Sequence, residues 1–137
     1  MNDFLSSMRI AATGLHAQTA RMRVLAENLA NADSAGKTPG EDPYRRKIPT
    51  FKSVMDNDIG GEVVKIGKIA LDQSEFQSRY EPGHPAADAN GYVKYPNVNA
   101  LIETMDMREA QRSYEANLNV VTVTRQMLGQ TIDLLKG

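Results

Sequence analysis

The N-terminal segment shows a regular alternation of apolar and polar positions that is typical of a helix. From Asn2 to Ala30 the chain has no proline and one glycine, Gly14. Apolar or small residues recur at steps of three and four, the spacing that places side chains along one narrow stripe of a helix. These positions are Leu5, Met8, Ala12, Leu15, Thr19, Met22, Ala26 and Leu29. The pattern predicts one long helix with a narrow apolar seam that stops near Asn31.

A second apolar stripe follows the C-terminal segment, which has no proline from Asn97 to Lys136. Apolar residues repeat there every seven positions, at Met107, Tyr114, Val121, Leu128 and Leu135. A further row, Val120, Met127 and Leu134, widens the apolar arc, so we expect this helix to contact more than one neighbour. Asn117, Thr124 and Thr131 interrupt the seam, and such polar groups favour one register at the expense of packing.

The middle of the chain has a different pattern. All six prolines and seven of the ten glycines lie between Gly36 and Pro96, where turn signals separate short runs rich in β-branched and aromatic residues. Glu62 to Leu71 is the clearest predicted strand, and Tyr44 to Phe51 and Phe76 to Tyr80 are weaker candidates. The sequence thus predicts a small β-rich module with a marginal core of its own.

These three segments predict a fold of the α+β class that is mainly α. The long N- and C-terminal helices pair as a coiled-coil hairpin, and a small β-rich central insertion separates them in the sequence. In domain terms, residues 1–31 and 97–137 form a coiled-coil assembly domain, and residues 32–96 form a loop-rich central domain.

Composition and charge exclude several classes of function. The 137 residues carry 16 Lys and Arg against 17 Asp and Glu, so the net charge of −1 provides no field that attracts nucleic acid. The longest uncharged run, Ile10 to Ala20, is too short to cross a bilayer, and Met1 to Arg9 lacks the features of a secretory signal. We therefore expect no nucleic-acid binding and no membrane insertion. The absence of cysteine suits both the reducing cytosol and a chain exported unfolded.

No motif of catalysis or cofactor binding is present in the sequence. His16 and His84 have no partners at ligand spacing, so we interpret them as a packing residue and a turn residue. Asp56 to Gly61 is similar to the start of a calcium loop, but Gly67 stands where such a loop needs glutamate. The cluster Arg45-Arg46-Lys47 could touch a phosphate or an acidic partner, but it is too short for a nucleic-acid surface. We expect no enzyme activity, no metal and no cofactor.

The two predicted helices would bury few large side chains by themselves. Their many Ala, Asn, Gln and Thr residues make it hard to offset the entropy of ordering them in an isolated monomer. Partner chains would supply the missing burial, and heterologous contacts repeated from subunit to subunit build rings or open helical filaments. The pattern favours an assembly subunit. The alternative is a self-contained soluble coiled-coil adaptor or chaperone with a small β insertion.

Several motifs resemble those of bacterial flagellar rod, hook and related axial proteins. The N-terminal ones are Thr13-Gly14-Leu15-His16-Ala17-Gln18, Arg21-Met22-Arg23-Val24 and the box Asn28-Leu29-Ala30-Asn31-Ala32-Asp33, and the C-terminal one is Arg112-Ser113-Tyr114-Glu115-Ala116-Asn117. Tyr80 to Asn99 is more particular and resembles the proximal-rod members of the flagellar basal-body rod family. With Pro43-Tyr44-Arg45-Arg46-Lys47, the resemblance covers both ends and much of the middle, and it is weak between Phe51 and Gln77.

This resemblance implies a structural subunit of the bacterial flagellar basal body, in the proximal rod that crosses the periplasm. The terminal helices would form the inner coiled-coil layer of a helical tube, with the central segment facing neighbouring subunits. The rod would act as a drive shaft for motor torque and continue the export channel. The implied partners are other copies of the chain, other proximal-rod subunits, the distal-rod protein, the inner-membrane ring with the export-gate region, and the flagellar type III export apparatus.

The paired seams and the motifs together predict an assembly interface. Its residues are Leu5, Met8, Leu15, Met22, Asn28, Leu29, Asn31, Met107, Tyr114, Asn117, Leu118, Val121, Leu128, Ile132 and Leu135. We expect the three asparagines to bond across the helix ends or fix the register, although Asn31 fits a capping role equally well. The second helix departs from the family pattern at Thr104, Arg108 and Glu115. Thr104 and Arg108 stand where relatives often carry apolar residues, so the start of the stripe faces solvent or an acidic neighbour.

Overall fold

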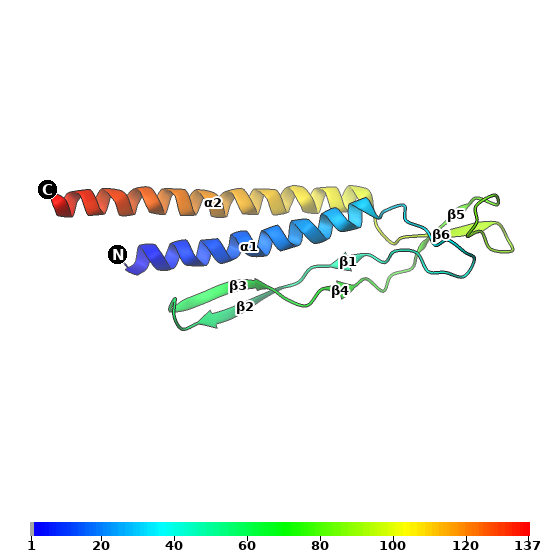
Figure 1. Cartoon of the computed structure of the whole chain (residues 1–137), viewed down its shortest axis with the longest axis horizontal. Helices are drawn as coiled ribbons and strands as arrows, with labels where there is room; N and C mark the ends of the chain where they lie inside the picture. The colour runs from blue at the N-terminus through cyan, green and yellow to red at the C-terminus, as the bar shows by residue number, and fades with distance from the viewer. Residues whose placement is uncertain (1) are drawn as a thin grey trace. The chain divides into compact units, whose positions relative to one another are not determined.

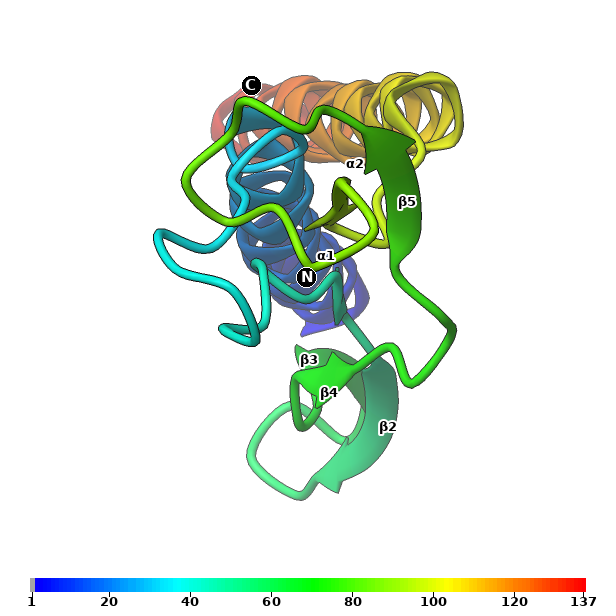
Figure 2. The same cartoon turned by 90° about the vertical axis from the view of Figure 1, so that its right-hand side faces the viewer.

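The computed structural model describes residues 2–137, which form two long helices separated in the sequence by six short strands (Figure 1). Helix α1 (Asn2–Ala30) and helix α2 (Ala100–Lys136) lie side by side in both views (Figures 1 and 2). This mainly helical α+β architecture confirms the predicted fold class. Among the described residues, no helix is long and apolar enough to span a membrane.

Helix α1 begins and ends where the sequence pattern predicts. Asp3 stands in its first turn, where a negative charge suits the positive end of the helix dipole. At the other end, the backbone N–H of Asn31 donates to the carbonyl oxygen of Glu27 at 3.1 Å. The Asn31 side chain donates to the same oxygen through Nδ2 at 2.9 Å. Asn31 therefore closes the last turn of the helix.

Helix α2 begins at Ala100, slightly later than the proline-free segment that predicts it. The side-chain Oδ1 of Asn99 accepts hydrogen bonds from the backbone N–H groups of Leu101 at 3.0 Å and Ile102 at 3.4 Å. These are the bonds of an N-cap, so Asn99 sets the start of the helix. Lys136 stands in the last turn, where a positive charge suits the helix dipole.

The strands form three two-stranded antiparallel sheets. Strand β1 (Lys47–Ile48) pairs with β4 (Ala70–Leu71), β2 (Phe51–Asp56) with β3 (Gly61–Ile66), and β5 (Gln77–Tyr80) with β6 (Tyr92–Tyr95). The predicted strand from Glu62 to Leu71 is thus divided into β3 and β4. Its partner side contains Pro49, which has no N–H to continue the ladder between β1 and β2.

Strand β6 occupies residues for which the sequence pattern predicts no strand. It alternates regularly, because Val93 and Tyr95 are buried while Tyr92 and Lys94 are exposed. Val93 and Tyr95 pack with Ala86 in a small apolar core. A run of four residues between a glycine and a proline is too short for periodicity to distinguish a strand from a loop.

The turn between β2 and β3 uses Asp56 to hold the backbone. Oδ1 of Asp56 accepts hydrogen bonds from the backbone N–H groups of Asp58 at 3.0 Å and Ile59 at 3.2 Å. Gly60 has a φ of 74°, a conformation that side chains with a Cβ rarely adopt. Within residues 2–137, no group of three or more potential metal ligands is found.

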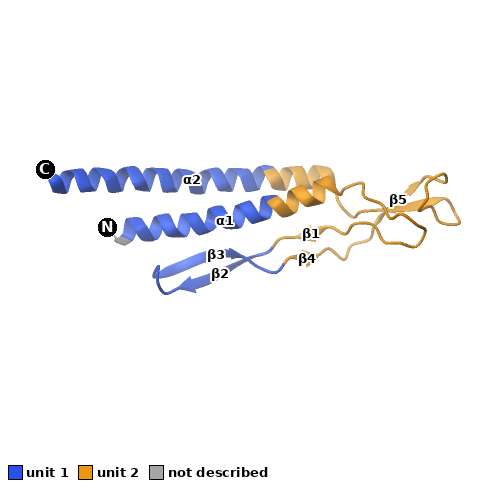
Figure 3. Ribbon diagram, viewed as in Figure 1, with its two compact units in different colours: residues 1–22, 50–68, 108–137 blue, residues 23–49, 69–107 orange. Residues whose placement is uncertain are grey.

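The chain forms two compact units, and each takes part of both helices (Figure 3). Unit 1 comprises Met1–Met22, Thr50–Lys68 and Arg108–Gly137, and unit 2 comprises Arg23–Pro49 and Ile69–Met107. The contacts therefore divide the chain across its helices. The sequence instead predicts one domain made of both helices and another made of the central segment, each with its own place in an assembly. That division stays a prediction.

The interiors of the two units differ in the size of their side chains. Unit 2 buries Leu25, Val93 and Val98, together with Tyr95 and Pro96. Unit 1 buries mainly small residues: Ala11, Ala17, Val63 and Ala110. Burial of apolar area is the main stabilising term in folding, so unit 2 has the better-developed core.

Candidate assembly interface

The buried side of α2 in unit 1 consists of small and polar residues. Ala110 and Thr124 are buried, and Asn117 and Thr131 are half-buried, all at steps of seven. A Cβ atom placed on Gly14 of α1 would lie 2.8 Å from Nδ2 of Asn117, so the two helices approach closely there. The glycine of the N-terminal motif thus meets the asparagine of the C-terminal motif.

Asn28 lies fully buried in unit 2 and uses the whole hydrogen-bonding capacity of its amide. Its Nδ2 donates to the carbonyl oxygen of Lys47 at 2.8 Å and to Oε2 of Glu103 at 3.1 Å. Its Oδ1 accepts from the hydroxyl of Tyr44 at 2.7 Å and from the backbone N–H of Lys47 at 3.0 Å. Asn28 therefore joins α1 to the segment around β1 and to the first turn of α2, whereas Asn31 bonds within its own turn and to Ser34.

The phenol of Tyr44 is part of the same arrangement. Burial raises the pKa of Tyr44 to about 12, and the negative charges of Glu27 and Glu103 add to the effect. A neutral phenol is what the geometry needs, because the hydroxyl must donate to Asn28.

Glu103 is the centre of a charge cluster in unit 2. Its side chain is fully buried, and its Oε1 pairs with Nε of Arg46. Arg46 also pairs with Asp72 through Nη1 at 3.3 Å and with Asp106 through Nη2 at 3.8 Å. Burial opposes the charge on Arg46, but its hydrogen bond with Glu103 and the nearby carboxylates raise its pKa on balance. One member of the basic cluster in the sequence thus has its acidic partners inside the chain.

A row of large apolar residues on α2 in unit 1 is open to solvent. Val120 is 46% exposed, Val123 51%, Met127 47% and Leu134 81%. Their steps of three, four and seven place them along one stripe, beside the buried side that carries Asn117 and Thr124. We call these four residues the outer row of α2. Contiguous exposed apolar groups of this kind mark interaction surfaces.

Apart from the buried Asn28, the predicted interface residues of α1 occupy positions of intermediate or high exposure. Leu5 is 45% exposed, and Met8, Leu15, Met22 and Leu29 are half-buried. Among the residues of this helix whose burial is described, the buried ones are Ala11, Ala17, Val24, Leu25 and Asn28. The predicted seam therefore differs from the face of α1 that is packed most closely within the chain.

The predicted residues of α2 show a similar distribution. Met107, Tyr114, Val121, Leu128 and Ile132 are half-buried, whereas Leu118 is 44% and Leu135 74% exposed. Thr104 and Arg108 are both exposed. Sequence reasoning missed Glu103, and it noticed Arg46 only as a member of the basic cluster, because the pairing of two distant charged residues has no signature in apolar periodicity. It noticed most of the outer row but did not place it in the interface.

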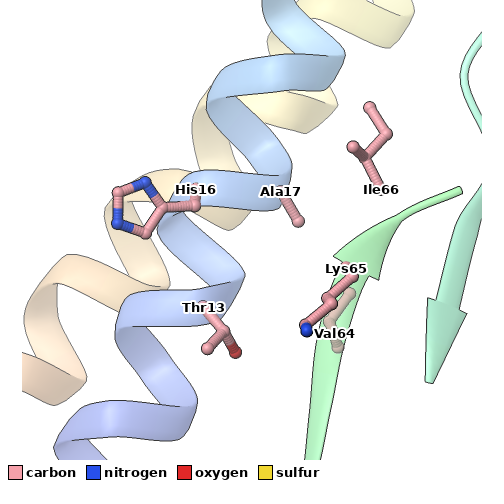
Figure 4. Close-up of a pocket in the computed structure, with 6 residues that line it drawn as sticks. All are labelled: Thr13, His16, Ala17, Val64, Lys65 and Ile66. Atoms are coloured by element: carbon pink, nitrogen blue, oxygen red, sulfur yellow. The ribbon is translucent and has the colours of Figure 1, made fainter. Parts of the chain in front are cut away.

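A hollow of about 390 Å³ lies between α1 and β3 in unit 1 (Figure 4). Thr13, His16 and Ala17 line it from the helix, and Val64, Lys65 and Ile66 from the strand. The His16 ring is directed away from β3 (Figure 4). The other histidine, His84, lies in a turn, where its Nδ1 accepts a hydrogen bond from the N–H of Ala86 at 3.0 Å. The lining of the hollow is mainly apolar, which suits packing.

Two family models match the parts of the chain that form this site. Residues 8–36, within and just after α1, match the model described as "Flagella basal body rod protein". Residues 89–134, which include most of α2, match the model described as "Flagellar basal body rod FlgEFG protein C-terminal". The two paired helices are thus the segments that define a class of flagellar rod proteins.

Full-length relatives specify the family further. The chain is 54% identical to the flagellar basal-body rod protein FlgC of Agrobacterium fabrum, over 100% of this chain and 99% of the relative. It is 41% identical to FlgC of Salmonella typhimurium over 95% and 96% of the two chains, and 38% identical to FlgC of Bacillus subtilis over 95% and 97%. The chain belongs to the FlgC family of flagellar basal-body rod proteins. It is a structural subunit of that rod.

Proposed function

We propose that this chain builds the proximal part of the rod through its two helices, which pack against the helices of neighbouring subunits as an inner layer. The outer row of α2 carries this proposal, because Val120, Val123 and Met127 are about half exposed and aligned on one stripe. The exposure of these apolar side chains to water is unfavourable, and a second apolar helix would cover them. The half-buried residues Met8, Leu15 and Met22 offer a similar surface on α1.

The exposed area of the chain supports assembly with more than one neighbour. A compact monomeric protein of 15.1 kDa exposes roughly 7,100 Å². This chain exposes 9132 Å², about 2,000 Å² more than that expectation. A standard protein–protein interface covers roughly 800 Å² on each partner, so the excess corresponds to more than one interface.

The partners follow from the same proposal. Contacts of one kind repeated between copies build an open helical array, and related subunits with similar helices extend it. We propose as partners other copies of the chain, other proximal-rod subunits, the distal-rod protein and the inner-membrane ring with the export-gate region. The type III export apparatus would deliver the chain, and the assembled rod would transmit torque and continue the export channel. The role is structural, with no catalytic step assigned to any residue.

The experiment places a charge in the outer row and compares it with a charge beside it. In the source bacterium with its own copy deleted, Val123→Asp abolishes swimming and rod completion, because an unpaired carboxylate in a covered apolar interface has a large desolvation cost. Gln126→Asp, at an exposed polar position of the same helix, preserves swimming. Immunoblots of exported protein confirm that both variants are made and secreted. Normal flagellation of the Val123→Asp strain would overturn the proposed interface.

A further inference from the structure

The buried residues Asn28 and Glu103 and the half-buried Arg46 form a connected cluster in unit 2, which we call the clasp. Arg46 pairs with one oxygen of Glu103, and Asn28 donates to the other at 3.1 Å. The three residues come from the end of α1, the segment before β1 and the first turn of α2. Asn28 and Glu103 are 75 positions apart in the sequence, and Arg46 and Glu103 are 57 apart. The clasp therefore joins both helices to the central segment at one point.

The clasp is closed, because each of its polar groups is paired within unit 2. Asn28 makes four hydrogen bonds, and both oxygens of Glu103 have partners. Asp72 and Asp106 complete the surroundings of the Arg46 guanidinium. A fully satisfied buried network specifies one arrangement, since a shift of register would leave several buried groups without partners.

Elsewhere in the helix pair, the described residues form no comparable buried polar network between α1 and α2. Five of the six largest fully buried side chains lie in unit 2, and Val63 alone of the six lies in unit 1. The ion pair that joins the helices in unit 1, Arg21 with Glu109, spans 3.6 Å, and the Glu109 side chain is 68% exposed. An exposed pair of this kind contributes little to stability.

We infer that the clasp orders unit 2 in the unassembled subunit and sets the register of α1 against α2 before the subunit joins the rod. The first turns of α2 and the last turns of α1 are then already paired. The remaining lengths of both helices, in unit 1, gain their protection when neighbouring subunits cover them. This inference rests on the proposed function for its final step, because the rod supplies that covering.

Hydrogen–deuterium exchange of the purified full-length chain at low micromolar concentration tests the inference. We expect slow exchange in residues 24–30 and 101–107 and fast exchange in residues 3–15 and 116–136. Glu103→Gln keeps the shape of the side chain but leaves Arg46 without its buried counter-charge. It should speed exchange in both slow segments by roughly a hundredfold, because breaking a buried ion pair strongly favours opening.

Two matched variants make the test specific. Glu109→Gln removes an exposed carboxylate from the same helix and should leave the exchange pattern unchanged. Asp106→Asn removes the most distant carboxylate around Arg46 and should give an intermediate effect. A Glu103→Gln chain that exchanges fast everywhere supports the inference, provided that the Asp106→Asn chain exchanges at rates between those of wild type and Glu103→Gln.

Three results would overturn the inference. They are equal exchange along each helix across the boundary between the units, an unprotected wild-type chain, or a Glu103→Gln pattern that matches wild type. None of them bears on the proposed function, which fails separately if the Val123→Asp strain swims. A uniformly protected chain that still builds rods would therefore contradict the clasp and leave the rod interface standing.

Discussion

In unit 2, Asn28 belongs to a motif that is recognisable in the sequence, but the role of the residue is not evident there. Asn28 is recognisable as part of an Asn-Leu-Ala-Asn box, and a bond from it across the helix ends was within reach of sequence reasoning. Its partner was not, because Glu103 stands in an ordinary helical segment and buried glutamates are rare. The structure explains the burial by full pairing: Arg46 and Asn28 take both carboxylate oxygens. Distant pairing of this kind has no local signal.

Because of Tyr44, the free energy of unfolding should depend on pH. In the folded chain its pKa is raised to about 12, whereas an unfolded tyrosine titrates near 10. The folded state holds the proton more tightly, so stability from this group is complete below pH ~10 and is lost as pH rises towards ~12. The free energy of urea unfolding should therefore fall more steeply between pH 9.5 and 11 in wild type than in Tyr44→Phe. Equal slopes would contradict this role, and Tyr80→Phe, at an exposed tyrosine, is the control.

At the scale of elements, the pattern of the sequence predicts the helices well and the strands only in part. Both helices lack proline and have long apolar repeats, and such periodic segments are the most predictable elements. The apolar seam does not identify the faces along which the two helices approach most closely. Small residues allow that approach: Gly14, Ala11 and Ala110. The large residues that dominate the periodicity lie instead on half-buried and exposed faces. Short strands such as β6 depend on tertiary pairing that periodicity cannot register.

Strand β6 offers a direct test of its assignment as an element with one buried face. Val93 is fully buried and Lys94 is exposed. Val93→Ala should lower the free energy of unfolding of unit 2 by roughly 2 kcal/mol, because it removes buried methyl groups and leaves a cavity. Lys94→Ala should change it by less than about 0.5 kcal/mol, as is usual for surface positions. Urea titrations of the purified variants measure both, and equal effects would show that β6 does not alternate as described.

At the scale of the whole molecule, we propose a subunit whose exposed apolar surface is covered only after it joins its neighbours in the rod. Sequence reasoning anticipated this from two weakly apolar helices and from motifs of the rod family, and the relatives confirm the family. It could not anticipate that the contacts divide the chain across its helices, since that division depends on which segments of the middle meet which turns of α1 and α2. In the assembled rod, we propose that other subunits cover the outer row of α2.

The most direct measurement uses the absence of cysteine from the chain, which lets Met127→Cys introduce a single thiol into the outer row. Met127 is 47% exposed, so a maleimide reagent should label the introduced thiol readily in the purified subunit. In intact basal bodies from swimming cells, we predict that the thiol is protected and becomes reactive only after denaturation. Glu75→Cys, at an exposed loop position, controls for reagent access. Equal labelling of the Met127→Cys thiol in the free subunit and in intact basal bodies would contradict the account.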